Sequence, residues 1–198
     1  MGILYTSVGG GAGSALWGPE LPLPVDGEFT WLNQGGASVA TTQDGIHLAI
    51  PAAAIAIRAR VKSVTAPYKI TAWLLAMSDP AGTSNFGLGF RQSSDGKNHA
   101  FILGPVIGSQ KQDAFVFNAN YTFTVVAGSV AFLGVPICVQ IEDDNVNRIV
   151  RYGFDGINFV NYHSVGRTDF LTANQVYFWG SSNAAFNTGL TLLRWKQE

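Results

Sequence analysis

Alternation between apolar and polar residues, interrupted by two turn signals, constrains this chain more than any other feature. The alternation runs through residues 137–142, resumes in residues 146–152 and continues in residues 157–162. A period of two is that of a strand with one buried face. Between these segments lie residues 143–145 (Asp-Asp-Asn) and 155–156 (Asp-Gly), which favour tight turns. We therefore predict three consecutive antiparallel strands joined by two hairpin turns.

Segments of the same kind recur along the whole chain and predict about twelve strands. Turn-forming residues separate them roughly every eight to twelve residues, and no window has a clear 3.6-residue helical period. We therefore expect an all-β fold, a two-sheet antiparallel jelly-roll sandwich. The expected strands are residues 29–32, 37–40, 46–50, 54–62, 68–77, 86–91, 99–103, 115–126 (one or two strands), 137–142, 146–152, 157–162, 176–179 and 190–195.

The composition limits the partners that this fold can have. Only 13% of the 198 residues are charged, the net charge is −1, and Lys and Arg form no block. A groove that follows nucleic-acid phosphates is therefore not expected. Cys138 is the single cysteine, which excludes an internal disulfide and a zinc site of several thiolates. With no signal-peptide pattern and no apolar run of bilayer length, we expect no membrane partner.

Residues 1–25 differ in composition from the rest of the chain, being Gly-rich, then Pro-rich, and nearly uncharged. Such segments are flexible or extended, and a disordered tail would also fit this composition. We expect a docking arm that lies along a neighbouring subunit or another protein, followed by one domain over residues 26–198. The expected apolar anchors of the arm are Ile3, Leu4, Trp17, Leu21 and Leu23.

Two of the predicted strands have unusual faces. In residues 86–91, Gly87 and Gly89 alternate with large apolar residues. Glycines in such a row let a second backbone or a flat ligand approach the sheet. In residues 54–62 every second position near the end is Arg or Lys, and we expect this basic face to meet solvent or a partner.

Several stretches resemble a concanavalin A-like (laminin G-like) jelly-roll domain. They are PYKITAWLLAM (67–77), FGLGFRQSSDGKNHAFILG (86–104), IEDDNVNRIVRYGFDGINFVNYHS (141–164), and QVYFWGSSN (175–183) with LTLLRW (190–195). The resemblance covers roughly residues 26–198, and the version of the fold that is most similar occurs in bacteriophage virion and tail proteins. It implies a virion protein, often one that contacts host glycans. We expect it to contact other virion proteins through the arm and to form a homo-oligomer, a trimer or larger.

Catalytic members of this fold use paired carboxylates, as glycosidases do. Glu142 and Asp144 have the i, i+2 spacing of such a pair, but Asp144 falls at a turn and the third acidic residue of the family is replaced by asparagine. Glycan-binding members often hold calcium through Asp and Asn side chains, and the cluster of Asp143, Asp144, Asn145 and Asn147 is explained by a hairpin turn alone. We expect no catalytic residue, no metal and no cofactor.

Sugar binding uses aromatic ring faces beside a few planar polar groups. The candidate residues for this role are Trp73, Tyr162 and Trp179, with Arg91, Asn158 and Asn183 as polar partners. For each of these aromatic residues, packing in the core or between sheets is the more common role and stays open as the alternative.

Three functions remain open at this stage. The first is a non-enzymatic structural protein of a bacteriophage particle, in the capsid, tail or fibre, with possible binding of host glycans. The second is a polysaccharide-binding module on the same fold. The third, which the residues favour least, is a glycoside hydrolase.

Overall fold

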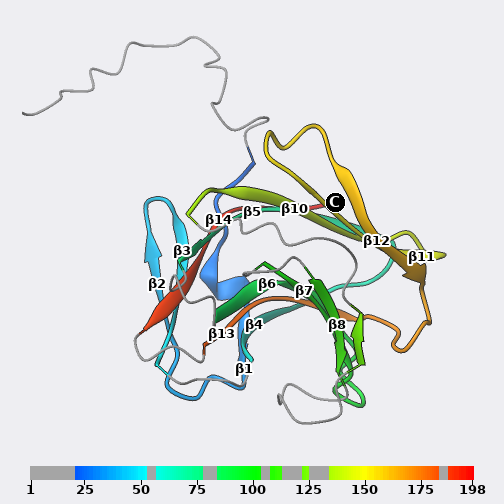
Figure 1. Cartoon of the computed structure of the whole chain (residues 1–198), viewed down its shortest axis with the longest axis horizontal. Helices are drawn as coiled ribbons and strands as arrows, with labels where there is room; N and C mark the ends of the chain where they lie inside the picture. The colour runs from blue at the N-terminus through cyan, green and yellow to red at the C-terminus, as the bar shows by residue number, and fades with distance from the viewer. Residues whose placement is uncertain are drawn as a thin grey trace, which may run out of the picture.

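The computed structural model describes residues 21–52, 57–77, 84–103, 108–112, 122–124, 134–182 and 187–198. These residues form two antiparallel sheets of seven strands each, packed face to face (Figure 1). Sheet A has the order β1 (Thr30–Leu32), β4 (Arg58–Ser63), β13 (Gln175–Ser182), β6 (Ser84–Arg91), β7 (Asn98–Ile102), β8 (Gly108–Gln112), β9 (Thr122–Thr124). Sheet B has the order β12 (Val160–Gly166), β11 (Asn147–Gly153), β10 (Ile137–Asp143), β5 (Tyr68–Met77), β14 (Thr188–Gln197), β3 (Gly45–Ile50), β2 (Ser38–Thr42).

The expected all-β jelly-roll sandwich is confirmed. A short 3-10 helix, η1 (Asp26–Glu28), is the one helical element in the described part of the chain. No helix among these residues is long and apolar enough to cross a membrane. Strands close in sequence often lie in different sheets: β13 pairs with β4 and β6, whereas β14 pairs with β3 and β5. These crossings between layers make the two sheets one structural unit.

The predicted triple of strands is present as β10, β11 and β12, which are neighbours in sheet B. The third strand begins at Val160 and ends at Gly166, three to four residues later than predicted, because residues 157–159 belong to the connecting loop. Asn145 (φ 74°) and Gly156 (φ 71°) occupy left-handed positions in the two connecting turns. Both are residue types that tolerate a positive φ. The turn chemistry read from the sequence therefore corresponds to the turns of the structure.

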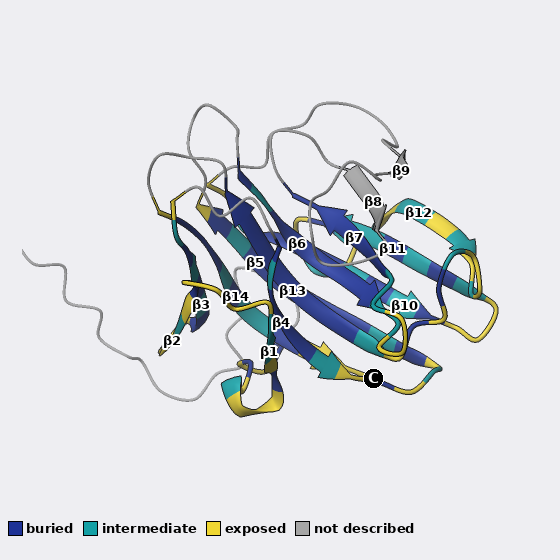
Figure 2. Ribbon diagram, turned by 90° about the horizontal axis from the view of Figure 1, so that it is seen from below, coloured by how far each residue is buried: buried dark blue, intermediate teal, exposed yellow. Residues whose placement is uncertain are grey.

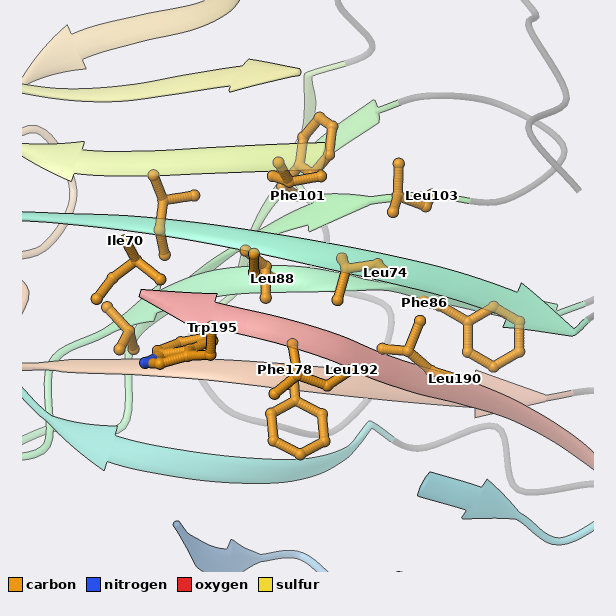
Figure 3. Close-up of a cluster of buried hydrophobic side chains, with 14 of the residues drawn as sticks. Ile70, Leu74, Phe86, Leu88, Phe101, Leu103, Phe178, Leu190, Leu192 and Trp195 are labelled. Carbon is orange, nitrogen blue, oxygen red and sulfur yellow. The ribbon is translucent and has the colours of Figure 1, made fainter. Parts of the chain in front are cut away.

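The main hydrophobic core lies between the two sheets. Inward-facing residues alternate along each strand, as Ile137, Val139 and Ile141 do in β10. Phe29 stands edge-on to both Phe178 and Trp195, with ring centroids 5.1 Å apart in each pair. Figure 3 shows part of this core, in which Leu88, Phe101 and Phe178 of sheet A meet Ile70, Leu74, Leu190, Leu192 and Trp195 of sheet B.

A second apolar layer covers the outer face of sheet A. Tyr177 and Trp179 of β13 lie there and are fully buried. Their rings lie beside Gly87 and Gly89 of β6, where no side chain occupies the space. A Cβ on Gly89 would lie 2.2 Å from Tyr177 Cζ, and one on Gly87 would lie 3.3 Å from Trp179 Nε1. A Cβ on Gly87 would also lie 2.0 Å from the backbone oxygen of Phe101. Gly89 therefore admits an aromatic ring of the neighbouring strand, and Gly87 admits the second backbone that we expected, that of Phe101 in β7.

The basic face of β4 contacts an earlier segment of the same chain. Arg60 forms an ion pair with Asp26 at 2.5 Å, and Lys62 forms one with Glu28 at 2.6 Å. The expectation that this face meets solvent or a partner is wrong for Arg60, which is buried, whereas Arg58 and Lys62 stay partly exposed. η1 supplies carboxylates opposite Arg60 and Lys62. These contacts attach the chain firmly to sheet A from residue 26 onward.

The end of the predicted arm lies on sheet B of its own chain. Leu21 is buried in a cluster with Trp73 and Cys138, and Trp195 N donates a hydrogen bond to Pro22 O at 3.0 Å. Leu23, by contrast, is exposed. The other three expected anchors, Ile3, Leu4 and Trp17, lie outside the described residues.

Candidate functional site

The β11–β12 connection is a loop that its own side chains hold in shape. Asp155 Oδ1 accepts the backbone N–H groups of Ile157 (2.9 Å) and Asn158 (2.8 Å), and Asp155 Oδ2 accepts Asn158 Nδ2 (2.6 Å). These hydrogen bonds hold the pKa of Asp155 below its usual value. The loop folds closely over Gly153, where a Cβ would lie 2.2 Å from Asn158 O. The loop therefore presents its exposed side chains from a defined backbone.

A row of aromatic rings runs from this loop to the inside of the sandwich. Phe154 and Tyr152 meet edge-on at 6.3 Å between ring centroids, Tyr152 and Tyr162 at 6.3 Å, and Tyr162 and Phe101 at 4.9 Å. Phe154 is 50% exposed. We call Tyr152, Phe154 and Tyr162 the aromatic rim. It lies on the side of the molecule where β11 and β12 of sheet B stand near β7 of sheet A (Figure 1).

A bulge in β12 is what turns Tyr162 toward β7. Val150 pairs with His163 and Arg151 pairs with Asn161, so Tyr162 is the extra residue between two pairs. A bulge breaks the strict alternation of a strand. Tyr162 and His163 therefore both face β7, where the His163 ring stands edge-on to His99 at 5.1 Å between centroids.

The Tyr162 hydroxyl is the polar group at the inner end of the rim. Burial, together with the neighbouring Tyr152, raises the pKa of Tyr162 to about 12, so the phenol stays protonated at neutral pH. Its oxygen is buried and makes no hydrogen bond to any residue that the structure describes. A buried polar group of this kind commonly forms its hydrogen bond with a water molecule or a ligand.

The polar face of β11 points the other way, to the outside of sheet B. Arg151 donates to Asn161 Oδ1 at 2.9 Å, to Gln140 Oε1 at 2.9 Å and to Glu142 Oε2 at 2.5 Å. Gln140 in turn donates to Thr71 Oγ1 at 3.1 Å. These hydrogen bonds connect side chains of four neighbouring strands, and the Glu142 carboxylate is one of the acceptors.

The acidic residues of the β10–β11 turn are also engaged. Asp144 Oδ1 accepts the N–H groups of Val146 (2.8 Å) and Asn147 (2.6 Å), which lowers the pKa of Asp144. A general acid needs the opposite shift, so that it holds a proton near neutral pH. Asp143 accepts Asn145 N–H and pairs with Arg167 at 3.2 Å. In the described ranges no three His, Cys, Asp or Glu side chains gather to hold a metal ion.

Cys138 is buried on the outer face of sheet B, beneath Leu21. Burial, with a smaller effect of Asp155, raises the pKa of the Cys138 thiol to about 12. A thiol with such a pKa carries almost no thiolate at neutral pH. The structure agrees with the sequence in offering no activation of this residue.

The six residues expected to bind sugar do not form one cluster. Tyr162 and Asn158 belong to the β11–β12 hairpin, and Arg91 lies on the outer face of sheet A, where it donates to Gln175 Oε1 at 2.5 Å. Trp179 is 0% exposed and its Nε1 points to backbone carbonyls of Leu88 and Phe101. Asn183 lies outside the described residues.

Trp73 and Trp179 are corrected to packing residues. Trp73 is buried under Leu21 and Phe159, and Trp179 closes the outer layer of sheet A. Neither indole face is open to a ligand in this structure. Sequence reasoning missed Phe154 and Tyr152, although the run Tyr-Gly-Phe-Asp-Gly (152–156) places two aromatic residues beside a turn.

The fold is the concanavalin A-like sandwich, and comparison with solved structures agrees with this. Carbohydrate-binding module CBM66 from Bacillus subtilis superposes with a TM-score of 0.58 at 8% identity, over 86% of this chain and 95% of that chain. The VIP36 exoplasmic/lumenal domain in its Ca²⁺/Man3GlcNAc-bound form has a TM-score of 0.60 at 7% identity, over 88% and 84%.

A third neighbour is a larger protein. The GH43 protein BlXynB of Bacillus licheniformis, as a K247S mutant, has a TM-score of 0.60 at 12% identity, over 90% of this chain but 37% of that chain. Neither a family model nor a curated protein sequence matches this chain. At these identities the structural likeness establishes the fold.

Proposed function

We propose that this protein binds glycans through the aromatic rim and does not hydrolyse them. The observation that carries the proposal is the half-exposed Phe154 ring beside Tyr152, with the unbonded Tyr162 hydroxyl behind them. Two structural neighbours support it, since one is a carbohydrate-binding module and another was solved with Man3GlcNAc.

The chemistry of the rim suits a sugar ring. An aromatic face packs against the C–H groups of a pyranose, and planar polar groups beside it bond the hydroxyls. Asp155 follows Phe154 directly and Asn158 lies on the same loop. The Asp155 carboxylate has lone pairs beyond those that the turn uses. No cation among the described residues of this loop would select an acidic sugar, so a neutral glycan fits best.

Binding to a panel of soluble polysaccharides tests the proposal. Phe154→Ala should weaken binding about 5- to 30-fold, because stacking on one ring contributes about 1–2 kcal/mol. Ile157→Ala is the matched control, since Ile157 is an apolar residue of the same loop and is 66% exposed. Affinity electrophoresis or calorimetry measures both. Equal binding by Phe154→Ala and the parent protein would contradict the proposal.

The absence of hydrolysis is a separate part of the proposal. It is supported by the engagement of Glu142 with Arg151 and by the lowered pKa of Asp144. Incubation with any polysaccharide that binds should release no reducing sugar. Release that Glu142→Gln abolishes would establish the glycoside hydrolase alternative.

We further propose that the protein acts in a bacteriophage particle, as a capsid-decoration, tail or fibre component. The support is the resemblance of residues 26–198 to virion proteins of this fold and the low charge, 13% of residues, which suits burial in an assembly. Mass spectrometry of purified particles whose genome encodes this chain tests it. Particles that lack the chain would refute this location and leave the glycan proposal standing.

A further inference from the structure

Residues 21–25, here called the strap, contain two buried residues, Leu21 and Pro24, and Leu21 packs on sheet B. Leu21 is seated among Trp73, Cys138, Phe159 and Leu193, which together we call the Leu21 pocket. The pocket is on the outer face of sheet B, away from the main core. Its walls come from β5, β10, β14 and the β11–β12 loop, so it exists without the strap.

The strap also extends the sheet. β3 pairs with β14 only as far as Leu192, opposite Ile46. Beyond that point Trp195 N donates to Pro22 O at 3.0 Å, so the strap takes the place beside β14 that β3 leaves open. Pro22 and Pro24 have no N–H to donate, which limits the number of backbone hydrogen bonds that hold the strap.

The attachment to the rest of the chain is stronger from residue 26 onward. Asp26 pairs with Arg60, and Phe29 is buried in the main core. Before that point, Leu23 is 49% exposed and Val25 is 59% exposed. The strap is therefore a short segment, held by Leu21, Pro24 and one hydrogen bond to β14, that lies directly before a more firmly held one.

We propose that the strap exchanges between copies of this chain, so that Leu21 of one copy fills the Leu21 pocket of another. Every contact that the strap makes within one chain can be made equally between two chains, which is the condition for segment exchange. In the exchanged form the straps of two copies run past each other at residues 23–25. Leu23 and Val25, which water covers in the single chain, then bury apolar surface against their counterparts.

The prolines favour this form. Pro22 and Pro24 restrict the strap to extended conformations whether it lies on its own chain or on another. Little conformational entropy is therefore lost when it leaves its own pocket and enters a second one. The exchange closes as a symmetric dimer, or as a ring if each strap reaches the next copy. It is independent of glycan binding at the rim.

Light scattering on the full chain gives the first test. We expect a mass that is a whole multiple of 21.1 kDa, two copies or more, at micromolar concentration. Leu23→Asp places a charge where the two straps meet and should weaken the association at least tenfold, while Leu23 is exposed enough for the fold to persist. A mass of 21.1 kDa at every concentration up to millimolar would overturn the proposal.

A disulfide distinguishes strap exchange from any other association. Cys138 is the only cysteine of the chain and belongs to the Leu21 pocket. Oxidised Leu21→Cys should therefore migrate mainly as a covalent dimer or larger ring product on a non-reducing gel. The double variant Leu21→Cys, Cys138→Ser should not. Cross-linked product at the monomer position alone, no cross-link at all, or a covalent dimer that survives Cys138→Ser would each overturn the proposal.

Discussion

Because Gly89 has no side chain, it leaves room for an aromatic ring. The Tyr177 ring lies over it, and Tyr177 Oη donates to Asn98 Oδ1 at 3.1 Å in a buried position. The ring needs the space, since even one carbon on Gly89 would lie 2.2 Å from Tyr177 Cζ. At this position glycine is required by close approach within the sheet.

Gly89→Ala should therefore destabilise the fold by about 2–4 kcal/mol, because it displaces the Tyr177 ring and breaks its buried hydrogen bond. Urea unfolding followed by circular dichroism measures the change. Gly166→Ala is the control, because a Cβ there meets nothing within 4 Å, and it should change stability by less than about 0.5 kcal/mol. A Gly89→Ala effect as small as the control would refute the packing role of Tyr177.

Cys138 offers a second prediction at the scale of one residue. Its raised pKa of about 12 and its burial predict that a thiol reagent at pH 8 leaves it unmodified in the folded protein. The thiolate fraction would be on the order of 10⁻⁴ at that pH. Chemical unfolding should restore ordinary reactivity within minutes. Rapid labelling of the folded chain would show that the strap leaves Cys138 accessible.

At the scale of elements, one arginine connects β11 to the segment that leads into β13. Arg148 is buried, and its guanidinium donates to the carbonyl oxygens of Arg167 (2.9 Å), Asp169 (2.6 Å) and Leu171. Its carbon Cζ also lies 5.7 Å from the centroid of the Phe90 ring. In a sheet, carbonyl groups such as these would accept hydrogen bonds from a neighbouring strand. Here the Arg148 guanidinium supplies the donors instead, and it thereby holds a turn of irregular backbone in place.

Arg148→Met keeps the length of the side chain and removes its donors. We expect a loss of about 3–5 kcal/mol, since three carbonyl groups lose their partner, one in a buried and two in part-buried positions. Hydrogen exchange should accelerate first in residues 166–174. Arg194→Met is the control, because Arg194 donates to the carbonyl of Asp44 in an exposed position. Equal stability of the two variants would contradict this role of Arg148.

At the scale of the whole molecule, strands from both halves of the sequence interleave in both sheets. β13 lies between β4 and β6, and β14 lies between β5 and β3. Figure 2 shows the result, with β5, β6 and β13 dark blue along most of their length and β12 largely teal and yellow at its edge. No part of the described sandwich holds a separate core between the sheets.

We therefore expect a single cooperative unfolding transition. Circular dichroism reports the strands, and tryptophan fluorescence reports Trp73, Trp179 and Trp195, which lie in three different buried clusters. Both signals should give the same midpoint if the sandwich unfolds as one unit. Two separate midpoints would show that the outer layer of sheet A or the Leu21 pocket melts on its own.

Local features of the fold were the most predictable. The β10–β11–β12 triple was predicted because its alternation and both its turns are encoded within 26 consecutive residues, 137–162. The candidate site was predicted in part: Tyr162 and Asn158 belong to the hairpin, but Trp73 and Trp179 are buried. Tyr152 and Phe154 were missed because their relation to Tyr162 depends on the bulge in β12.

The sequence by itself determined the all-β class, the local hairpins and the charge that excludes a phosphate-binding groove, because alternation and turn chemistry act between neighbouring residues. Only the tertiary structure decided which apolar faces are covered. Period two assigns Trp179 to the face of β13 opposite Phe178, but both faces of sheet A are buried, and that depends on residues far apart in the chain. This long-range packing buries Trp179 and leaves Phe154 half exposed.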